Sequence, residues 1–188
     1  MHDAVPLDRF NAATAAELDE LLRACVSSPA WAERILAGRP YGSIDDLVAA
    51  GEKAVRDLDT GEVDAALAGH PRIGERTERS SFSADEQAGV RRSSGQACVD
   101  GGSSGQGSPG SDSPGPGDDT AARLADGNAR YEDRFGYVFL IRAAGRDAEE
   151  ILAELERRLG NDPAAERAEA AGQLAEITAL RLRRVVTP

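Results

Sequence analysis

The sequence predicts an all-α protein: a single compact, bundle-like domain of about eight helices with one low-complexity loop insert. Apolar residues recur at helical spacing over most of the chain, and helix N-cap signals precede several of these stretches. The 188 residues suit one domain, whose 40% hydrophobic content is mostly aliphatic. The one strongly β-prone run, 137–141, has no visible partner strand, so we expect a short buried extended segment there.

N-cap residues indicate where the helices begin. A Ser, Thr or Asp side chain ahead of an apolar stripe accepts the first free N–H groups of a helix. Residues of this kind precede helical patterns at Thr14, Ser28, Ser43, Ser83, Asp147 and Asp162. A short helix over 60–68 and one from Thr120 to Phe135 complete the set. In the helix that follows Ser43, Gly51 is a weak point or a break.

Residues 91–119 have a different composition from the rest of the chain. They are rich in Gly, Ser and Pro and carry almost no large apolar side chain. Such a stretch cannot bury enough surface to offset the entropy of ordering, so we expect a disordered insert. A boundary between two domains is the alternative, but neither flank looks complete alone, and we favour one domain over 1–188.

Charge and motif content exclude several classes of function. With 33 acidic and 22 basic residues the net charge is -11, which argues against nucleic-acid and membrane-surface partners. Cys25 and Cys98 lie far apart and in no metal or redox motif. No phosphate-binding loop, dinucleotide fingerprint or zinc motif occurs, so neither a cofactor nor a metal is expected. No signal peptide or membrane-length apolar run is found, so we expect a cytoplasmic protein.

His70 is the first candidate for chemistry. It opens the hexapeptide HPRIGE, in which Pro71 should end the preceding helix and Gly74 permits unusual backbone conformations. The imidazole is therefore expected at a helix exit on a stiff turn, where it can give or take a proton near neutral pH. An ordinary loop histidine has the same pattern, so the hexapeptide alone leaves both interpretations open.

Arg181 and Glu86 are the other two candidates. On a helical wheel, Arg181 falls near the middle of the apolar stripe of 174–185. A buried guanidinium needs a partner: a structural ion pair, backbone carbonyls at the helix end, or an anion bound at a site. Glu86 follows Ser83 at capping-box spacing and can serve only that helix start, or orient a histidine or a substrate amide.

The order of several short motifs resembles one enzyme family. The segments FNAAT, HPRIGE, SADEQAG, GNARYEDRFGYVFLIRAAGR, RLGND and EITALRLRRVV occur in this order over the whole chain except the insert. Together they resemble 2-oxo-4-hydroxy-4-carboxy-5-ureidoimidazoline (OHCU) decarboxylases. The resemblance implies an all-α, usually homodimeric enzyme without cofactor or metal. Its substrate would be a small ureidoimidazoline carboxylate, converted to (S)-allantoin and CO2 in urate breakdown.

The resemblance also assigns roles by position. His70 matches the catalytic proton donor, with Pro71 beside it in the substrate pocket, and Arg181 matches a functionally important arginine. One substrate-binding stretch is Ser83, Ala84, Asp85, Glu86 and Gln87, with Glu86 as an essential carboxylate. A second stretch, expected to frame the substrate ring, is Phe139, Leu140, Ile141, Arg142 and Ala143.

A non-catalytic helical interaction module, or an inactive paralogue, is the alternative function. The insert departs from the family, in which the corresponding link is short and helical. An enzyme requires His70, Glu86 and Arg181 to converge on one cleft. In an interaction module, Arg181 would pair with a helix acid and His70 would lie far from Glu86. The distances between these side chains discriminate the two.

Overall fold

A computed structural model describes residues 4–68, 70, 72, 73 and 116–188. Within these ranges the chain forms eight helices and two short strands, which confirms the predicted all-α class. The elements are β1 (Val5–Pro6), α1 (Leu7–Ala12), α2 (Ala15–Cys25), α3 (Pro29–Ala37), α4 (Ile44–Arg56), α5 (Thr60–Ala68), α8 (Pro116–Phe135), α9 (Ala148–Arg158), α10 (Pro163–Val185) and β2 (Val186–Thr187). None of the described helices is both long and apolar enough to cross a membrane.

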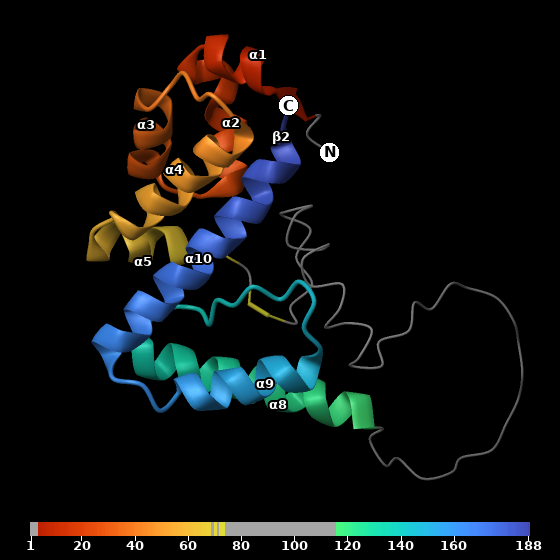
Figure 1. The fold of residues 1–188 in the computed structure, drawn as a ribbon. Coiled ribbons are helices and arrows are strands. Elements are labelled where there is room, and N and C mark those ends of the chain that lie inside the picture. Colours follow the sequence, from red (N-terminus) through yellow and green to blue (C-terminus); the bar gives the residue numbers. More distant parts are fainter. Residues whose placement is uncertain (1–3, 69, 71, 74–115) are drawn as a thin grey trace, which may run out of the picture.

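Helix α10 is the axis on which the other elements are arranged (Figure 1). Helices α1–α4 gather around its C-terminal half, and α4 packs along it most extensively. Helices α8 and α9 lie side by side across its N-terminal end. The two ends of the described chain meet, because β1 and β2 pair in parallel with Val5 opposite Val186.

Five of the predicted N-caps lie at the starts of described helices. Thr14 and Asp147 each close a capping box, in which the cap side chain and the third helical residue bind each other's backbone N–H. Ser28, Ser43 and Asp162 accept backbone N–H groups at their own helix starts. The predicted cap at Ser83 lies outside the described residues.

Three local features differ from the sequence prediction. Helix α8 begins at Pro116 rather than Thr120, so the last four residues of the predicted insert are its first turn. Proline is well suited to the first position of a helix, where its missing N–H costs no hydrogen bond. Helix α1, only 6 residues long, was not predicted. The predicted break at Gly51 is wrong, because α4 continues through it.

The extended segment predicted over 137–141 is confirmed: it lacks regular secondary structure and, apart from Val138, is buried. The same irregular backbone continues to Ala143, so the extended segment of the structure is 137–143. Gly136 (φ +79°) ends α8 and Gly145 (φ +84°) precedes α9, both in the left-handed region that favours glycine. In Figure 1 this segment runs between α10 and the α8–α9 pair. The segment therefore packs between helix α10 and the α8–α9 pair.

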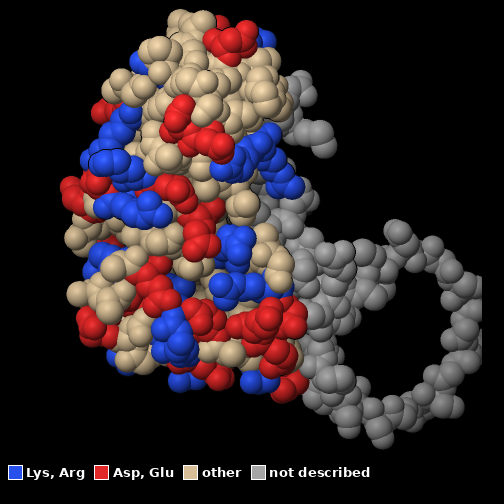
Figure 2. Space-filling model, viewed as in Figure 1, with Lys and Arg blue, Asp and Glu red and all other residues tan. Residues whose placement is uncertain are grey.

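Surface charge is mixed on the face that Figure 2 shows. Acidic and basic side chains of the described residues alternate over it without a broad basic patch. Many form exposed ion pairs one helical turn apart, such as Arg23 with Asp19. Such pairs contribute little to stability individually, so the core must provide most of the free energy of folding.

Candidate active site

His70 lies immediately after α5 and is only 9% exposed. Its backbone N–H donates to the carbonyl of Leu67 at 3.0 Å, and its Nδ1 lies 3.0 Å from the carbonyl oxygen of Ala66. Because a carbonyl oxygen only accepts hydrogen bonds, this contact places a proton on Nδ1. The other ring nitrogen, Nε2, is then the one that can exchange a proton with a bound molecule.

The residues after His70 fix the turn against α8. Arg72 donates through Nε and Nη2 to the two carboxylate oxygens of Glu132, each at 2.6 Å. The carbonyl of Ile73 accepts a hydrogen bond from the Asn128 amide at 3.0 Å. The bidentate pair is directional, so it restrains the orientation of the turn as well as its position. Arg72 and Ile73 are therefore both held against α8, whereas Pro71 and Gly74, on which the expected stiff turn depends, lie outside the described residues.

Arg181 lies on α10 and is only 5% exposed, as the helical wheel predicted. Its Nη1 donates to the carbonyls of Cys25 at 3.1 Å and Ala24 at 3.3 Å, at the C-terminal end of α2. The same nitrogen lies 3.5 Å from His70 Nε2. Backbone carbonyls are thus among the partners that a buried guanidinium requires, and His70 lies beside them.

Two helix C-termini converge at this point. The carbonyls that end α2 contact Arg181, and the carbonyl of Ala66 near the end of α5 contacts His70. Helix C-termini carry partial negative charge and unsatisfied carbonyls, both of which favour a cation. The arrangement holds a buried guanidinium next to a titratable imidazole. Chemically, this pair can bind an anion and move a proton.

The second predicted substrate-binding stretch is buried among α8, α9 and α10. Phe139, Leu140, Ile141 and Ala143 are each at most 5% exposed. Arg142 is more exposed, and its side chain forms an ion pair with Glu176 of α10 at 3.1 Å. Its backbone N–H donates to Gln173 Oε1 of the same helix at 2.9 Å. Helix α10 therefore carries both Arg181 and contacts to this stretch.

The structure brings two of the three predicted catalytic residues together, His70 and Arg181. Glu86 and the rest of the first substrate-binding stretch, Ser83, Ala84, Asp85 and Gln87, lie outside the described residues, as does Pro71. Among the residues that are described, no group of three or more His, Cys, Asp or Glu side chains is arranged to hold a metal ion.

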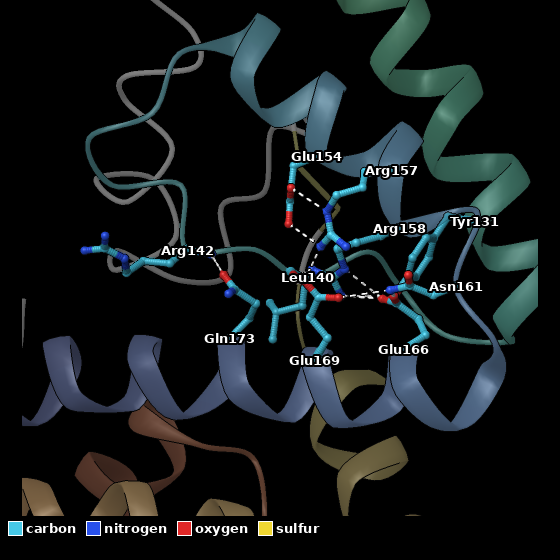
Figure 3. A network of polar contacts seen from close by, with 10 residues as sticks. All are labelled: Tyr131, Leu140, Arg142, Glu154, Arg157, Arg158, Asn161, Glu166, Glu169 and Gln173. Atoms are coloured by element: carbon cyan, nitrogen blue, oxygen red, sulfur yellow. Dashed lines mark hydrogen bonds and ion pairs between the residues drawn. The ribbon is translucent and has the colours of Figure 1, made fainter.

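A buried polar network that we did not predict lies beside the extended segment (Figure 3). Arg158 of α9 and Glu166 of α10 form an ion pair in which both side chains are 0% exposed. Arg158 Nε donates to Glu166 Oε1 at 2.8 Å, and the Tyr131 hydroxyl donates to the same oxygen. Asn161 donates to the other oxygen of Glu166 at 2.7 Å. Arg158 Nη1 donates to the carbonyl of Leu140 at 2.8 Å.

Titration in this network follows from burial and from the paired charges. Burial, and then the hydrogen bond to Glu166, raises the pKa of Tyr131 well above its ordinary value. Burial alone would lower the pKa of Arg158, but the hydrogen bond and charge of Glu166 raise it overall. Arg158 also lies over the ring of Phe139, 4.7 Å from its centroid. At neutral pH the Tyr131 hydroxyl therefore keeps its proton and the Arg158 guanidinium keeps its charge.

The helical wheel that predicted the burial of Arg181 would also have found Arg158. Ile151, Leu155 and Arg158 follow at i, i+4 and i+7, so Arg158 lies on the apolar stripe of α9. Glu166 lies likewise on a stripe of α10 with Ala170. A charged residue on an apolar stripe was the available signal in both helices.

Comparison with known proteins agrees with the motif order. A family model described as OHCU decarboxylase matches residues 11–99 and 105–183. The 2-oxo-4-hydroxy-4-carboxy-5-ureidoimidazoline decarboxylase of Amia calva is 30% identical over 158 residues, which are 84% of this chain and 81% of that one. The protein of the same name from Haloferax volcanii is 32% identical over 155 residues, 82% of this chain and 80% of that one.

The fold is also similar to that of a solved structure. A crystal structure of OHCU decarboxylase in the presence of (S)-allantoin superposes with a TM-score of 0.63 at 21% identity. The superposition covers 86% of this chain and 94% of that one. The family model and the two sequence relatives each match most of the chain. This protein therefore belongs to the OHCU decarboxylase family.

Proposed function

We propose that this protein decarboxylates OHCU to (S)-allantoin and CO2, as a carbon–carbon lyase of urate degradation. Membership of the family supports the reaction. The observation that carries the location of the site is the 3.5 Å approach of Arg181 Nη1 to His70 Nε2, where the C-terminal ends of α2 and α5 converge. The catalytic residues are His70, Arg181 and Glu86.

Arg181 binds and orients the substrate carboxylate. A guanidinium has five N–H donors, so it can contact the α2 carbonyls and a carboxylate at the same time. The substrate anion balances a positive charge that is otherwise held by helix-end carbonyls. Holding the carboxylate out of the ring plane aligns the breaking carbon–carbon bond with the conjugated ring, which promotes its cleavage.

The substrate accepts the electrons of the broken bond itself. When CO2 leaves, the electron pair of the carbon–carbon bond passes into the conjugated C=N and C=O groups of the ring. A proton must then add to the ring carbon that bears the ureido group, and the face of addition sets the (S) configuration. The enzyme therefore needs a proton donor fixed on one face and a site that stabilises the anion.

His70 delivers this proton from Nε2 as the imidazolium, since the neutral ring carries its one proton on Nδ1. The contact of Nδ1 with the Ala66 carbonyl holds the ring in one orientation, so Nε2 faces one side of the site. The Arg72–Glu132 pair restrains the turn that carries His70. Glu86 orients His70 or binds the ureido N–H groups, and residues 139–143 frame the ring.

A homodimer in the cytoplasm is also part of the proposal, and light scattering in solution tests the dimer.

Production of (S)-allantoin tests the function directly. OHCU is generated in situ from urate by the upstream enzymes, and the circular dichroism of allantoin is followed with and without this protein. The proposal predicts rapid appearance of the (S) signal with the protein present. A time course identical to the spontaneous reaction would favour an inactive paralogue or a non-catalytic interaction module.

A further inference from the structure

The backbone of the extended segment 137–143 is bound by side chains from two helices. Because the segment lacks regular secondary structure, its buried N–H and C=O groups need partners from elsewhere. Arg158 of α9 donates to the Leu140 carbonyl at 2.8 Å, and Gln173 of α10 accepts the Arg142 N–H at 2.9 Å (Figure 3). The two contacts fix backbone groups two residues apart.

Arg158 is itself immobilised by charge and packing. Its Nε and Nη2 donate to Glu166 Oε1, and its guanidinium carbon lies over the Phe139 ring. A fully buried Arg–Glu pair cannot change its geometry without exposing an unpaired charge to the core. The position of the Leu140 carbonyl is therefore tied to the rigid α9–α10 junction.

Gln173 ties the other end of the segment to the helix that carries Arg181. The two residues are eight positions apart on α10, about 12 Å along the helix axis. Because α10 is continuous between them, the Gln173 contact sets where residue 142 lies relative to the guanidinium. A shift of the extended segment would change its distance from the Arg181 guanidinium, and a substrate that contacts both would then bind less well.

We propose that Arg158 and Gln173 are positioning residues for substrate binding, which hold the backbone of 139–143 in register with Arg181. This inference rests on the proposed function, in which that segment frames the substrate ring. Neither residue contacts the reacting atoms. Their loss should weaken substrate binding without altering the proton transfer from His70, because a small misplacement of a binding group acts mainly on affinity.

Gln173→Met is the principal test, because methionine keeps the length of the side chain and removes the acceptor. We expect KM to rise by about five- to tenfold, with a much smaller change in kcat, as for loss of one partly buried hydrogen bond. The pH dependence of kcat should stay as in the wild type, and the Arg142 amide should exchange its hydrogen faster. Two results would overturn the proposal. One is faster exchange of the Arg142 amide with a KM equal to that of the wild type, and the other is an unchanged exchange rate of that amide.

Arg158→Lys supplies a second test with a matched control. Lysine keeps the charge beside Glu166 but has no fork to contact the Leu140 carbonyl as well, so KM should rise. Arg157→Lys makes the same change one residue away, at an exposed arginine paired with Glu154 and Glu169, and should leave KM unchanged. Equal KM values in the two variants would contradict the role of Arg158.

The outcome of this test is separable from that of the proposed function. If the wild-type protein does not accelerate (S)-allantoin formation, the proposed function fails before any variant is made. If the wild type is active and the variants keep its KM, only the positioning role fails. Should Arg158→Lys not fold, Gln173→Met still decides, since Gln173 is only partly buried.

Discussion

The contact between α4 and α10 at Gly51 predicts a measurable steric cost. A Cβ added at Gly51 would lie 2.5 Å from Leu182 Cδ1, closer than real Cβ contacts allow. It would also meet Thr178 at 3.7 Å and Trp31 at 3.8 Å. All three neighbours are 0% exposed, so Leu182 has little room to move aside. Leu182 follows Arg181, so a displaced α10 would also disturb the site.

The magnitude follows from two opposing terms. Alanine is favoured over glycine inside a helix by about 1 kcal/mol. Overpacking a core with one methyl group costs about 1–3 kcal/mol. Gly51→Ala should therefore lower the free energy of unfolding by about 0–2 kcal/mol. Gly172→Ala is the matched control, because it is also helical but its Cβ would meet nothing within 4 Å.

Urea unfolding of the two variants isolates the steric term. Gly172→Ala should raise the free energy of unfolding by about 0.5–1 kcal/mol through helix propensity alone. The two variants should then differ by about 1–3 kcal/mol, with unchanged m-values. If Gly51→Ala stabilised the protein as much as Gly172→Ala does, the close approach of α4 to α10 at this point would be refuted.

Two further predictions concern the buried polar network. Arg158→Met should lower the free energy of unfolding by about 3–5 kcal/mol, because it leaves the Glu166 carboxylate buried without its cation. The double variant Arg158→Met/Glu166→Leu should lower it by less. Urea denaturation of these two variants and of Glu166→Leu checks this, and a loss in the double variant equal to the sum of the two single losses would contradict the coupling. Burial raises the pKa of Tyr131 and of Tyr137 in the folded protein, so the stability gained from keeping them neutral is complete below their unfolded pKa of about 10 and is lost as the pH rises beyond it. Thermal denaturation at alkaline pH should thus show a melting temperature that falls steeply with pH in the wild type and less steeply in Tyr131→Phe. The same fall in melting temperature with pH in both proteins would argue against a buried Tyr131.

Local signals in the sequence predicted the local structure well. The caps at Thr14 and Asp147 work through side chains within three residues of their partners, so the sequence contains all that is needed. The burial of Arg181 follows equally from the period of its own helix. The sites predicted at Pro71 and at Ser83–Gln87 remain predictions, because they lie outside the described residues.

Features that depend on contacts between distant segments could not be predicted. The pairing of β1 with β2 joins opposite ends of the chain through two residues each, too few to leave a pattern. Gly51 permits a close approach of α10, which no property of α4 alone reveals. The approach of His70 to Arg181, 111 residues later, was expected only because the motif order resembles a family. Spacing alone left their relation open.

The stereochemistry of the product formed by His70→Asn tests the central claim most directly. Asparagine lacks a group that can deliver a proton at neutral pH, while the helices around it keep their packing. With OHCU generated in situ, we predict that this variant forms allantoin at the spontaneous rate and without enantiomeric excess, and that its far-ultraviolet circular dichroism equals that of the wild type. An excess of (S)-allantoin at near wild-type rate would contradict the assignment of His70 as the proton donor.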